Sequence, residues 1–437
     1  TNTKINSQDS ENYYSAAEIF CDADERSAKN KPLSPNKTKR QIAKIHIQSN
    51  TIFDEADSDT YAVHHLANWM HVTTKESVIR ERLPFKEGDL LDEDDLLEAE
   101  RIIRSQPYIR DVRVTFKESC DINEPTQIEI KTWDTWSFIP TVSFGRKGGE
   151  NKLSLGVKED NVLGSGIRAR FKYNSDEQRS GYQFTLKSPF AYVPYSTVLL
   201  DFMDNDDGQL THLEFDKPFY HMRSENMFNA SFFQNEQTVD VFQNGLTRNT
   251  YAEDNHRYAV SGGWQLSQEG NRSTRIKFGY VDESAKFEAN NSLEPFDNLF
   301  VPLDRNFQYP WVGIEYSERE FKTMSEVYLT NQTEDINLGW HHELSLGFEV
   351  NDLAPSSDLG YHINAATSKG LEVFDGLMLF SASAEAHIDT SQADQFVFSG
   401  NLEYFKRYND LLGLYASVSG TASDNAFLDQ PITLGDE

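Results

Sequence analysis

The sequence is short of long apolar runs and of positive charge. None of its 437 residues lies in an apolar run of the roughly 18 residues that a membrane-spanning helix needs, and the mean hydropathy is −0.62. Spanning helices are therefore excluded, whereas a membrane β-barrel is not, because every second residue of its strands faces a polar lumen. The sequence contains 41 basic and 70 acidic residues, and the resulting net charge of −29 argues against a nucleic-acid partner.

Motifs for catalysis are also missing. The sequence contains no Gly-x-Ser-x-Gly elbow, no phosphate-binding loop and no closely spaced cysteine pair. His64, His65 and His71 lie close together, but adjacent helix positions do not share a face, so we do not expect them to bind a metal. We expect no catalytic residue, no metal, no cofactor and no enzymatic activity.

Cysteine is scarce, with Cys21 and Cys120 alone in the chain. A periplasmic location would permit a disulfide between the N-terminal tail and the first folded domain. Two free thiols fit the sequence equally well, because the sequence gives no distance between them.

What the sequence does have is a repeated alternation of apolar and polar residues, from Trp136 to the end. Successive strand side chains point to opposite faces, so each segment has one apolar and one polar face. Segments of about ten residues between polar turns are typical of a membrane β-barrel, although a large soluble β-protein also alternates. At about 3.3 Å per residue and a tilt of about 45°, ten residues cover roughly 23 Å of the membrane normal. The clearest examples are Ile167–Tyr173, Tyr182–Lys187, Leu344–Val350 and Phe396–Tyr404.

Sixteen segments are predicted as strands, and those at 322–330 and 359–367 also fit loops. The stretches 237–256 and 282–307 are predicted as surface loops. The predicted strands are 137–145, 152–161, 166–174, 181–188, 197–204, 209–216, 227–236, 257–267, 273–283, 308–318, 322–330, 337–350, 359–367, 376–387, 395–406 and 411–422.

The first part of the chain has a different pattern. Residues 1–40 are polar and predict a flexible tail, whereas residues 41–133 predict one small α/β domain with the order strand, helix, helix, strand, strand. Thr74 is the expected cap of a short helix, and Asp92 is the expected cap of a longer one that reaches Gln106. Residues 134–437 predict strands alone.

Two blocks of sequence carry a family resemblance. Residues 101–114, RIIRSQPYIRDVRV, resemble the last helix and following strand of a POTRA domain, whose element order matches the one above. Residues 159–166, EDNVLGSG, are similar to the turn after the second barrel strand in BamA/TamA-type outer-membrane assembly proteins. The last residues, PITLGDE, look like the approach to that family's Arg-Gly-Phe/Tyr loop motif. The resemblance covers about residues 41–437.

The resemblance implies a mainly β protein. Its fold would be a transmembrane antiparallel β-barrel of about 16 strands in the complete protein, preceded by one POTRA-like domain. It implies a bacterial surface antigen in the outer membrane of a Gram-negative bacterium, with residues 41–133 in the periplasm. Because an open barrel edge in lipid is not viable, we expect the barrel over residues 134–437 to be incomplete at its C-terminus.

The resemblance also suggests three sets of site residues. A POTRA edge strand would bind an incoming extended client by backbone pairing. The family turn would be a structural hallmark without chemistry, and the first barrel strand would form a weak seam, because Pro140 lacks an N–H. The three sets are Ile109, Asp111, Val112, Arg113, Val114 and Phe116 at the edge strand; Asn161, Leu163, Gly164 and Gly166 in the turn; and Phe138, Pro140, Val142 and Phe144 at the seam.

The function that the resemblance implies is outer-membrane protein biogenesis, in which the chain assists insertion or translocation of client polypeptides. Its partners would be outer-membrane lipid and lipopolysaccharide, unfolded clients, and a periplasmic or inner-membrane protein that contacts the POTRA-like domain. Two alternatives share the fold: a two-partner-secretion transporter, and a passive channel or surface-binding barrel whose acidic outer loops set selectivity.

Overall fold

The computed structural model describes most of the chain. The described residues are 39–53, 68–69, 71–117, 126–147, 150–176, 179–243, 246–289, 301–329, 332–349, 360–390, 393–409 and 412–430. Nearly all of the predicted tail, both cysteines and the PITLGDE end lie outside these residues.

In the described residues, the N-terminal domain contains a small four-stranded sheet and the helices α2 and α3. In the sheet order β2-β1-β4-β3, β1 runs parallel to β4, and β3 runs antiparallel to β4 at the edge. The elements are β1 Arg40–Asn50, α2 Glu76–Arg82, β2 Leu90–Leu91, α3 Glu93–Arg104, β3 Ile109–Lys117 and β4 Thr126–Asp134.

One apolar core holds this domain together. Ile79 and Ile103 from the helices pack with Ile128 and Ile130 of β4, and all four side chains are fully buried. The Asp92 side chain accepts a hydrogen bond from the Asp95 N–H and completes a capping box, as predicted, at the start of α3. Thr74 does not cap α2, whose N-cap is Lys75 without a side-chain hydrogen bond, so that prediction is wrong.

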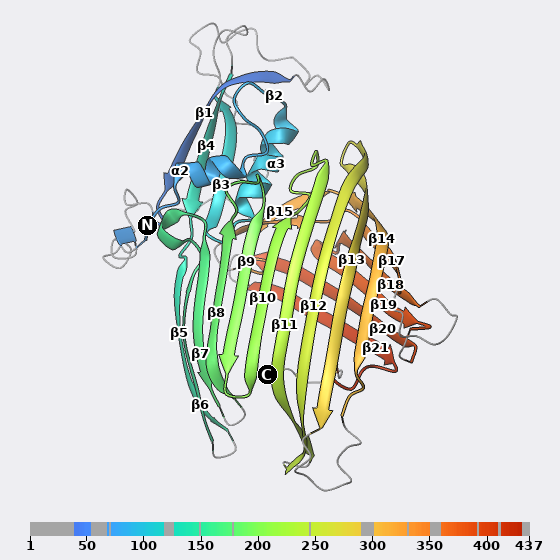
Figure 1. Ribbon diagram of the computed structural model, residues 1–437. Helices are drawn as coiled ribbons and strands as arrows, with labels where there is room; N and C mark the ends of the chain where they lie inside the picture. The colour runs from blue at the N-terminus through green and yellow to red at the C-terminus, as the bar shows by residue number, and fades with distance from the viewer. Residues whose placement is uncertain are drawn as a thin grey trace, which may run out of the picture.

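The rest of the chain forms one antiparallel sheet of fifteen strands among the described residues. It starts with β5 and ends with β21. Each strand pairs with the next one along the chain, except that β14 pairs with β17 because β15 and β16 form a separate hairpin. Figure 1 shows the curled wall that these strands form. Its strands are β5 Phe138–Lys147, β6 Glu150–Glu159, β7 Arg168–Ser175, β8 Ser180–Pro189, β9 Thr197–Asn205, β10 Gly208–Lys217, β11 Asn226–Gln243, β12 Leu246–Glu269, β13 Arg272–Ala289, β14 Arg305–Glu318, β17 His341–Phe348, β18 Tyr361–Val373, β19 Gly376–Ile388, β20 Gln395–Asn409 and β21 Leu412–Asp424.

The register places apolar side chains together on one face of the whole wall. Val157 pairs with Phe171, Phe171 with Phe184, and Phe184 with Phe202. At the far edge Leu402 pairs with Val418 on the same face. Many of these side chains are exposed, which leaves an apolar outer face and turns the alternate residues inward.

The inner face of the wall is polar. Arg275 and Lys277 of β13 both contact Glu315 of β14, at 2.6 Å each, and Lys277 also reaches Glu343 of β17 at 2.9 Å. This ladder of opposite charges neutralises groups that burial inside the curled sheet would otherwise penalise.

Fifteen of the sixteen predicted segments match strands of the wall. The exception is 322–330, which falls at the hairpin of β15 Phe321–Ser325 and β16 Thr333–Asn337, a sheet of its own. The loop predicted at 237–256 is wrong, because β11 and β12 continue through it as paired strands. The loop predicted at 282–307 is wrong at its ends, where β13 runs on to Ala289 and β14 begins at Arg305. In this part of the wall the outer face is polar, and the apolar side chains of Val239, Tyr251 and Phe287 cluster on the inner face, so the pattern is reversed relative to the rest of the wall.

None of the helices in the described ranges is long and apolar enough to span a membrane.

Candidate functional site

The small domain sits on one end of the curled wall, at the turns that join β6 to β7, β8 to β9 and β10 to β11 (Figure 1). The first of these turns carries the predicted family motif. The Lys75 N–H donates to the Gly164 carbonyl at 3.0 Å. A Cβ on Gly164 would lie 2.4 Å from the Thr73 carbonyl oxygen, and one on Gly166 would lie 3.0 Å from both the Tyr108 hydroxyl and Val78. Both glycines have φ +70°, so this turn needs glycine for its backbone conformation and for close docking.

A buried polar network holds the same turn. The Asn161 amide donates to the Thr74 hydroxyl at 2.8 Å, and its oxygen accepts from the Gly166 N–H at 2.7 Å. The Thr74 N–H and hydroxyl both donate to Asp134, at 2.8 and 2.9 Å, and His71 contacts the same carboxylate oxygen at 2.8 Å. Thr74 is thus a bridge between Asp134 and the turn, which explains why it is unavailable as a helix cap. The predicted hallmark turn is the joint between the small domain and the wall.

Two further turns bind the helices of the domain. The Tyr195 hydroxyl donates to the Leu83 carbonyl at 2.9 Å, and the Met222 N–H donates to Glu98 of α3 at 2.8 Å. Arg223 forms an ion pair with Asp95 of α3. Burial raises the pKa of the Tyr220 phenol far above its usual range, so this group stays neutral where it packs on Tyr195 with ring centroids 4.6 Å apart.

The β15–β16 hairpin connects α3 to the distant strands of the wall. Asp335 of β16 pairs with Arg104 of α3 at 2.5 Å, and both side chains are nearly inaccessible to solvent. At the other end Glu326 pairs with Arg407 at 2.6 Å, and the Tyr328 hydroxyl donates to Glu403 at 2.5 Å.

The hairpin lies on the inner side of the wall. Glu403 and Arg407 of β20 alternate with Leu402, which is on the outer face, so both point inward. The side chain of Leu338, just after β16, lies so close to Gly370 of β18 that a Cβ there would be 2.5 Å from it. The hairpin therefore crosses the domain end of the curled sheet as an internal strap. Between it and α3 lies a cavity of about 470 Å³, lined by Arg101, Arg104, Arg319, Phe321, Leu329 and Ile336.

The predicted client edge, β3, is the outermost strand of the small sheet. Ile109, Val112 and Val114 point into the core and are buried, whereas Arg113 is exposed. Phe116 packs against the core from a half-buried position.

Side chains of α3 already bind part of this edge. The Val114 N–H donates to Glu100 at 2.7 Å, and the Val112 carbonyl accepts from Arg104 at 3.2 Å. Arg104 also contacts Asp111 at 3.3 Å. Burial raises the pKa of Glu100, opposed by the hydrogen bond from Val114 and by Arg104. A client strand that pairs here must therefore displace these two side chains.

The predicted seam strand is β5, at one edge of the fifteen-stranded sheet. Phe138, Pro140, Val142 and Phe144 all lie on its outer face, and Pro140 pairs with Val157. Val142 and Phe144 are among the most exposed apolar side chains of the wall. Among the residues that the structure describes, β5 pairs only with β6, and β21 only with β20.

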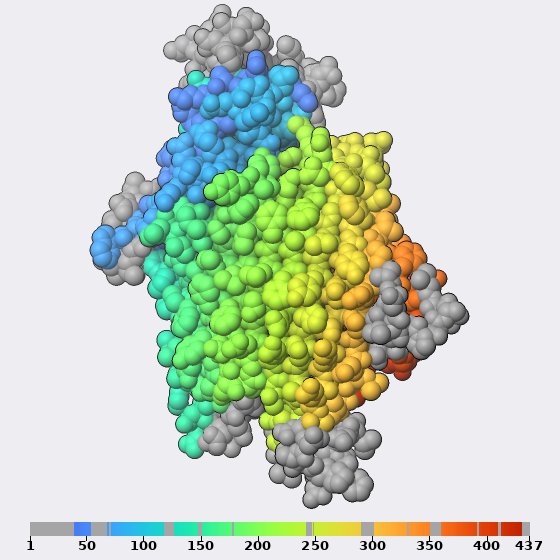
Figure 2. Space-filling model, viewed as in Figure 1, coloured from blue at the N-terminus to red at the C-terminus, as the bar shows by residue number. Residues whose placement is uncertain are grey.

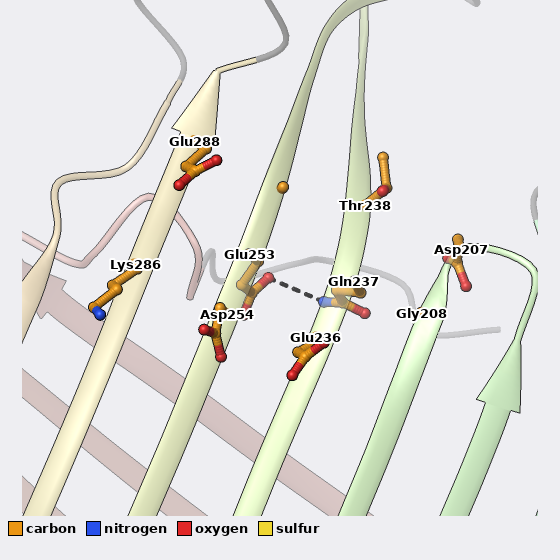
Figure 3. Close-up of a pocket in the computed structure, with 10 residues that line it drawn as sticks. Asp207, Gly208, Glu236, Gln237, Thr238, Glu253, Asp254, Lys286 and Glu288 are labelled. Carbon is orange, nitrogen blue, oxygen red and sulfur yellow. Dashed lines mark hydrogen bonds between the residues drawn. The ribbon is translucent and has the colours of Figure 1, made fainter.

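A second hollow lies at the opposite end of the wall (Figure 3). Its volume is about 410 Å³, and it is lined by Asp207, Glu236, Glu253, Asp254 and Glu288, with Lys286 as its cation. Gln237 donates to Glu253 at 3.0 Å, and Arg179 pairs with Asp207 at 2.7 Å. The hollow can attract cations by its charge, but no group of side chains in the described part of the chain has the arrangement of a metal site.

No family model matches the chain, and no curated protein matches it as a relative. Solved structures that are similar include BamA from Haemophilus ducreyi lacking POTRA domains 1-3, with 11% identity, a TM-score of 0.34, and coverage of 88% of this chain and 72% of that one. CdiB from Acinetobacter baumannii is similar with 11% identity, a TM-score of 0.32, and coverage of 88% and 74%. CdiB from Escherichia coli has 8% identity, a TM-score of 0.31, and coverage of 91% and 87%.

The predicted mainly β architecture, with a large antiparallel sheet, is confirmed by the sheet of fifteen strands among the described residues rather than by these likenesses.

Sequence reasoning missed the internal strap and the two docking turns at Tyr195 and Met222. The sequence predicted a single strand at 322–330, whereas the strap consists of two short polar strands separated by a turn. The docking contacts join residues more than a hundred positions apart, for which a single sequence carries no signal.

Proposed function

We propose that the chain is an outer-membrane protein biogenesis factor, whose curled wall spans the outer membrane and whose small domain lies in the periplasm. The continuous apolar outer face supports the membrane location, because so many exposed apolar side chains on neighbouring strands would otherwise be in water. The domain would receive an unfolded client, and the wall would assist its insertion.

The observation that carries this function is the open edge of β3 beside the end of the wall. An edge strand can add an extended segment by backbone hydrogen bonds. Glu100 and Arg104 occupy its outward groups at Val112 and Val114, and side-chain contacts of this kind can yield to a full backbone ladder. The contacts of Glu100 and Arg104 would therefore favour clients whose extended segments are long enough to form several backbone pairs with β3.

Export through the lumen is the alternative function, and the strap bears on it directly. The hairpin is tied to α3 at one end and to β20 at the other, so a polypeptide passing through the lumen would have to displace it. Insertion at the wall needs no such displacement, which is why we favour insertion over export and over a passive channel.

Photo-crosslinking tests client capture at β3. A photoreactive amino acid replaces Thr115, which is exposed on β3, and in a second protein it replaces Glu129, which is half-exposed on β4. Glu129 lies on the same face of the sheet, because it pairs with Thr115, but it is on an interior strand that has β1 on its other side. With an unfolded outer-membrane polypeptide, we expect crosslinks at Thr115 to exceed those at Glu129 about tenfold.

Equal crosslinking at the two positions would count against capture by the edge. In a third protein the photoreactive amino acid replaces Ser381, which faces the lumen. Crosslinks to the client at Ser381, rather than at Thr115, would favour export.

A further inference from the structure

Three exposed apolar side chains belong to the joint or lie close to it along the chain. Trp69 is 81% exposed, Leu163 is 69% exposed and Val72 is 49% exposed. Val72 borders the β6–β7 turn, since a Cβ on Gly164 would lie 3.5 Å from its side chain. We call these three residues the Trp69 patch.

Leu163 is unusual in both its exposure and its backbone. It has φ +52°, a conformation that favours glycine or asparagine and that a leucine adopts at a cost. Neither turn geometry nor packing within the described residues explains an apolar side chain at this point. A favourable partner for the side chain outside the protein would explain it.

The patch continues the apolar outer face of the wall. Phe138 and Trp136, both exposed, lead up to the joint at the same end of β5. Figure 2 shows, in blue, a part of the small domain that projects sideways beside the upper end of the wall, next to its first strands in teal. The exposed Lys75 follows Val72 closely in the chain, and its N–H binds the turn.

We propose that the Trp69 patch is a lipid-contact surface that enters the headgroup layer on the domain side of the membrane. A lipid surface is the occupant that fits, because the patch is continuous with a face that already meets acyl chains under the proposed function, on which this inference rests. Tryptophan prefers this interfacial depth, and a nearby lysine can bind lipid phosphate. Contact at the patch would fix the tilt of the small domain, and hence the position of the β3 edge relative to the wall.

Quenching by brominated lipid tests the contact. The full-length chain is placed in nanodiscs of phosphatidylcholine with bromine near the headgroup end of the acyl chains, and in the same lipid without bromine. The difference between wild type and Trp69→Phe isolates the emission of Trp69 from that of the other five of the six tryptophans. We expect the emission of Trp69 to be quenched more strongly by lipid brominated near the headgroup than by lipid brominated near the methyl end of its acyl chains.

A second variant keeps the turn and removes the apolar side chain. Leu163→Asn suits the positive φ better than leucine does, so the joint should stay folded. We expect it to lower the quenching of Trp69 about twofold, because the patch then binds the interface less strongly.

Trp264, exposed on the outer face of β12, is the matched control. If Trp264 is quenched and Trp69 is not, the wall lies in lipid and the inference about the patch is wrong. If neither is quenched, the membrane location itself is wrong. Unchanged quenching of Trp69 in Leu163→Asn would also overturn the inference, because the patch would then not act as a unit.

Discussion

At the scale of single residues, the joint depends on positions where a small side chain or a particular hydrogen bond is required. Asn161 supplies both an acceptor to Gly166 and a donor to Thr74 from one amide group. Asparagine is suited to this task because its amide carries donors and an acceptor together. The sequence predicted the turn, and only the structure shows that the turn faces another domain.

Gly164→Ala should disrupt the joint through a steric clash. The new Cβ would lie 2.4 Å from the Thr73 carbonyl, whereas Gly270→Ala, also at positive φ (+59°), would meet nothing within 4 Å. Both substitutions add backbone strain of about 1 kcal/mol, so any larger loss in Gly164→Ala measures the clash. We expect Gly164→Ala to cost about 2–4 kcal/mol in unfolding of the small domain, and limited proteolysis should cut between the domain and the wall. Equal stability of the two variants would show that the turn does not dock as described.

His221 should make the joint sensitive to acid. Burial lowers its pKa from the usual 6.5, and its Nδ1 accepts a hydrogen bond from the Arg223 N–H at 3.2 Å. Because its folded pKa is below the unfolded one, its contribution to stability is present above pH 6.5 and is lost as the pH falls through the folded pKa. Hydrogen exchange in the β10–β11 turn should therefore quicken from about pH 7.5 to about pH 5.5, after correction for intrinsic rates. His221→Asn keeps an acceptor and does not titrate, so this pH dependence should disappear, and its persistence would assign the effect to another group.

At the scale of elements, the sequence was informative where one face of a strand or helix differs from the other. The N-cap Asp92 of α3 and the strands of the apolar region were predictable, because local pattern and tertiary role agree there. The ends of β11, β12 and β13 were not, since their outer face is polar and their apolar side chains, such as Tyr251 and Phe287, lie on the inner face, opposite to the face that is apolar in the rest of the wall. The strap was not predictable either, because its contacts are ion pairs with residues far along the chain.

The strap should open when its buried ion pair is weakened. Asp335→Asn leaves Arg104 paired with Asp111 and Glu100 but removes the negative charge of its partner on β16. We expect a cost of about 1–3 kcal/mol in local opening, seen as faster hydrogen exchange of the β15 and β16 amides. Lys322→Gln is the control, because its pair with Glu372 is exposed at 2.7 Å and contributes about 0–1 kcal/mol. Similar exchange in the two variants would mean that the strap does not depend on α3.

At the scale of the whole molecule, the register unites fifteen strands into one wall with two unlike faces. Each pairing is local, but the consequence is global, because a slip of one residue in any strand would move its apolar side chains to the lumen. The joint then places the small domain, with its β3 edge, at one end of this wall. Sequence predicted the two faces of single strands, whereas the position of the domain follows only from contacts between distant turns and helices.

Two neighbouring residues of β9 test which face of the wall meets lipid. Phe202 pairs with Phe184 on the outer face, and Met203 pairs with Gln183 on the inner face, so both are apolar residues of the same strand. An arginine on the lipid face near the bilayer midplane costs about 2–4 kcal/mol, whereas one in a polar lumen costs little. We therefore expect Phe202→Arg to lower the free energy of unfolding in lipid vesicles by about 2–4 kcal/mol and Met203→Arg by about 0–1 kcal/mol, as measured by denaturant titration. If Met203→Arg proved the more costly of the two, the face that carries Phe202 would not meet lipid, and the wall would not be a membrane barrel.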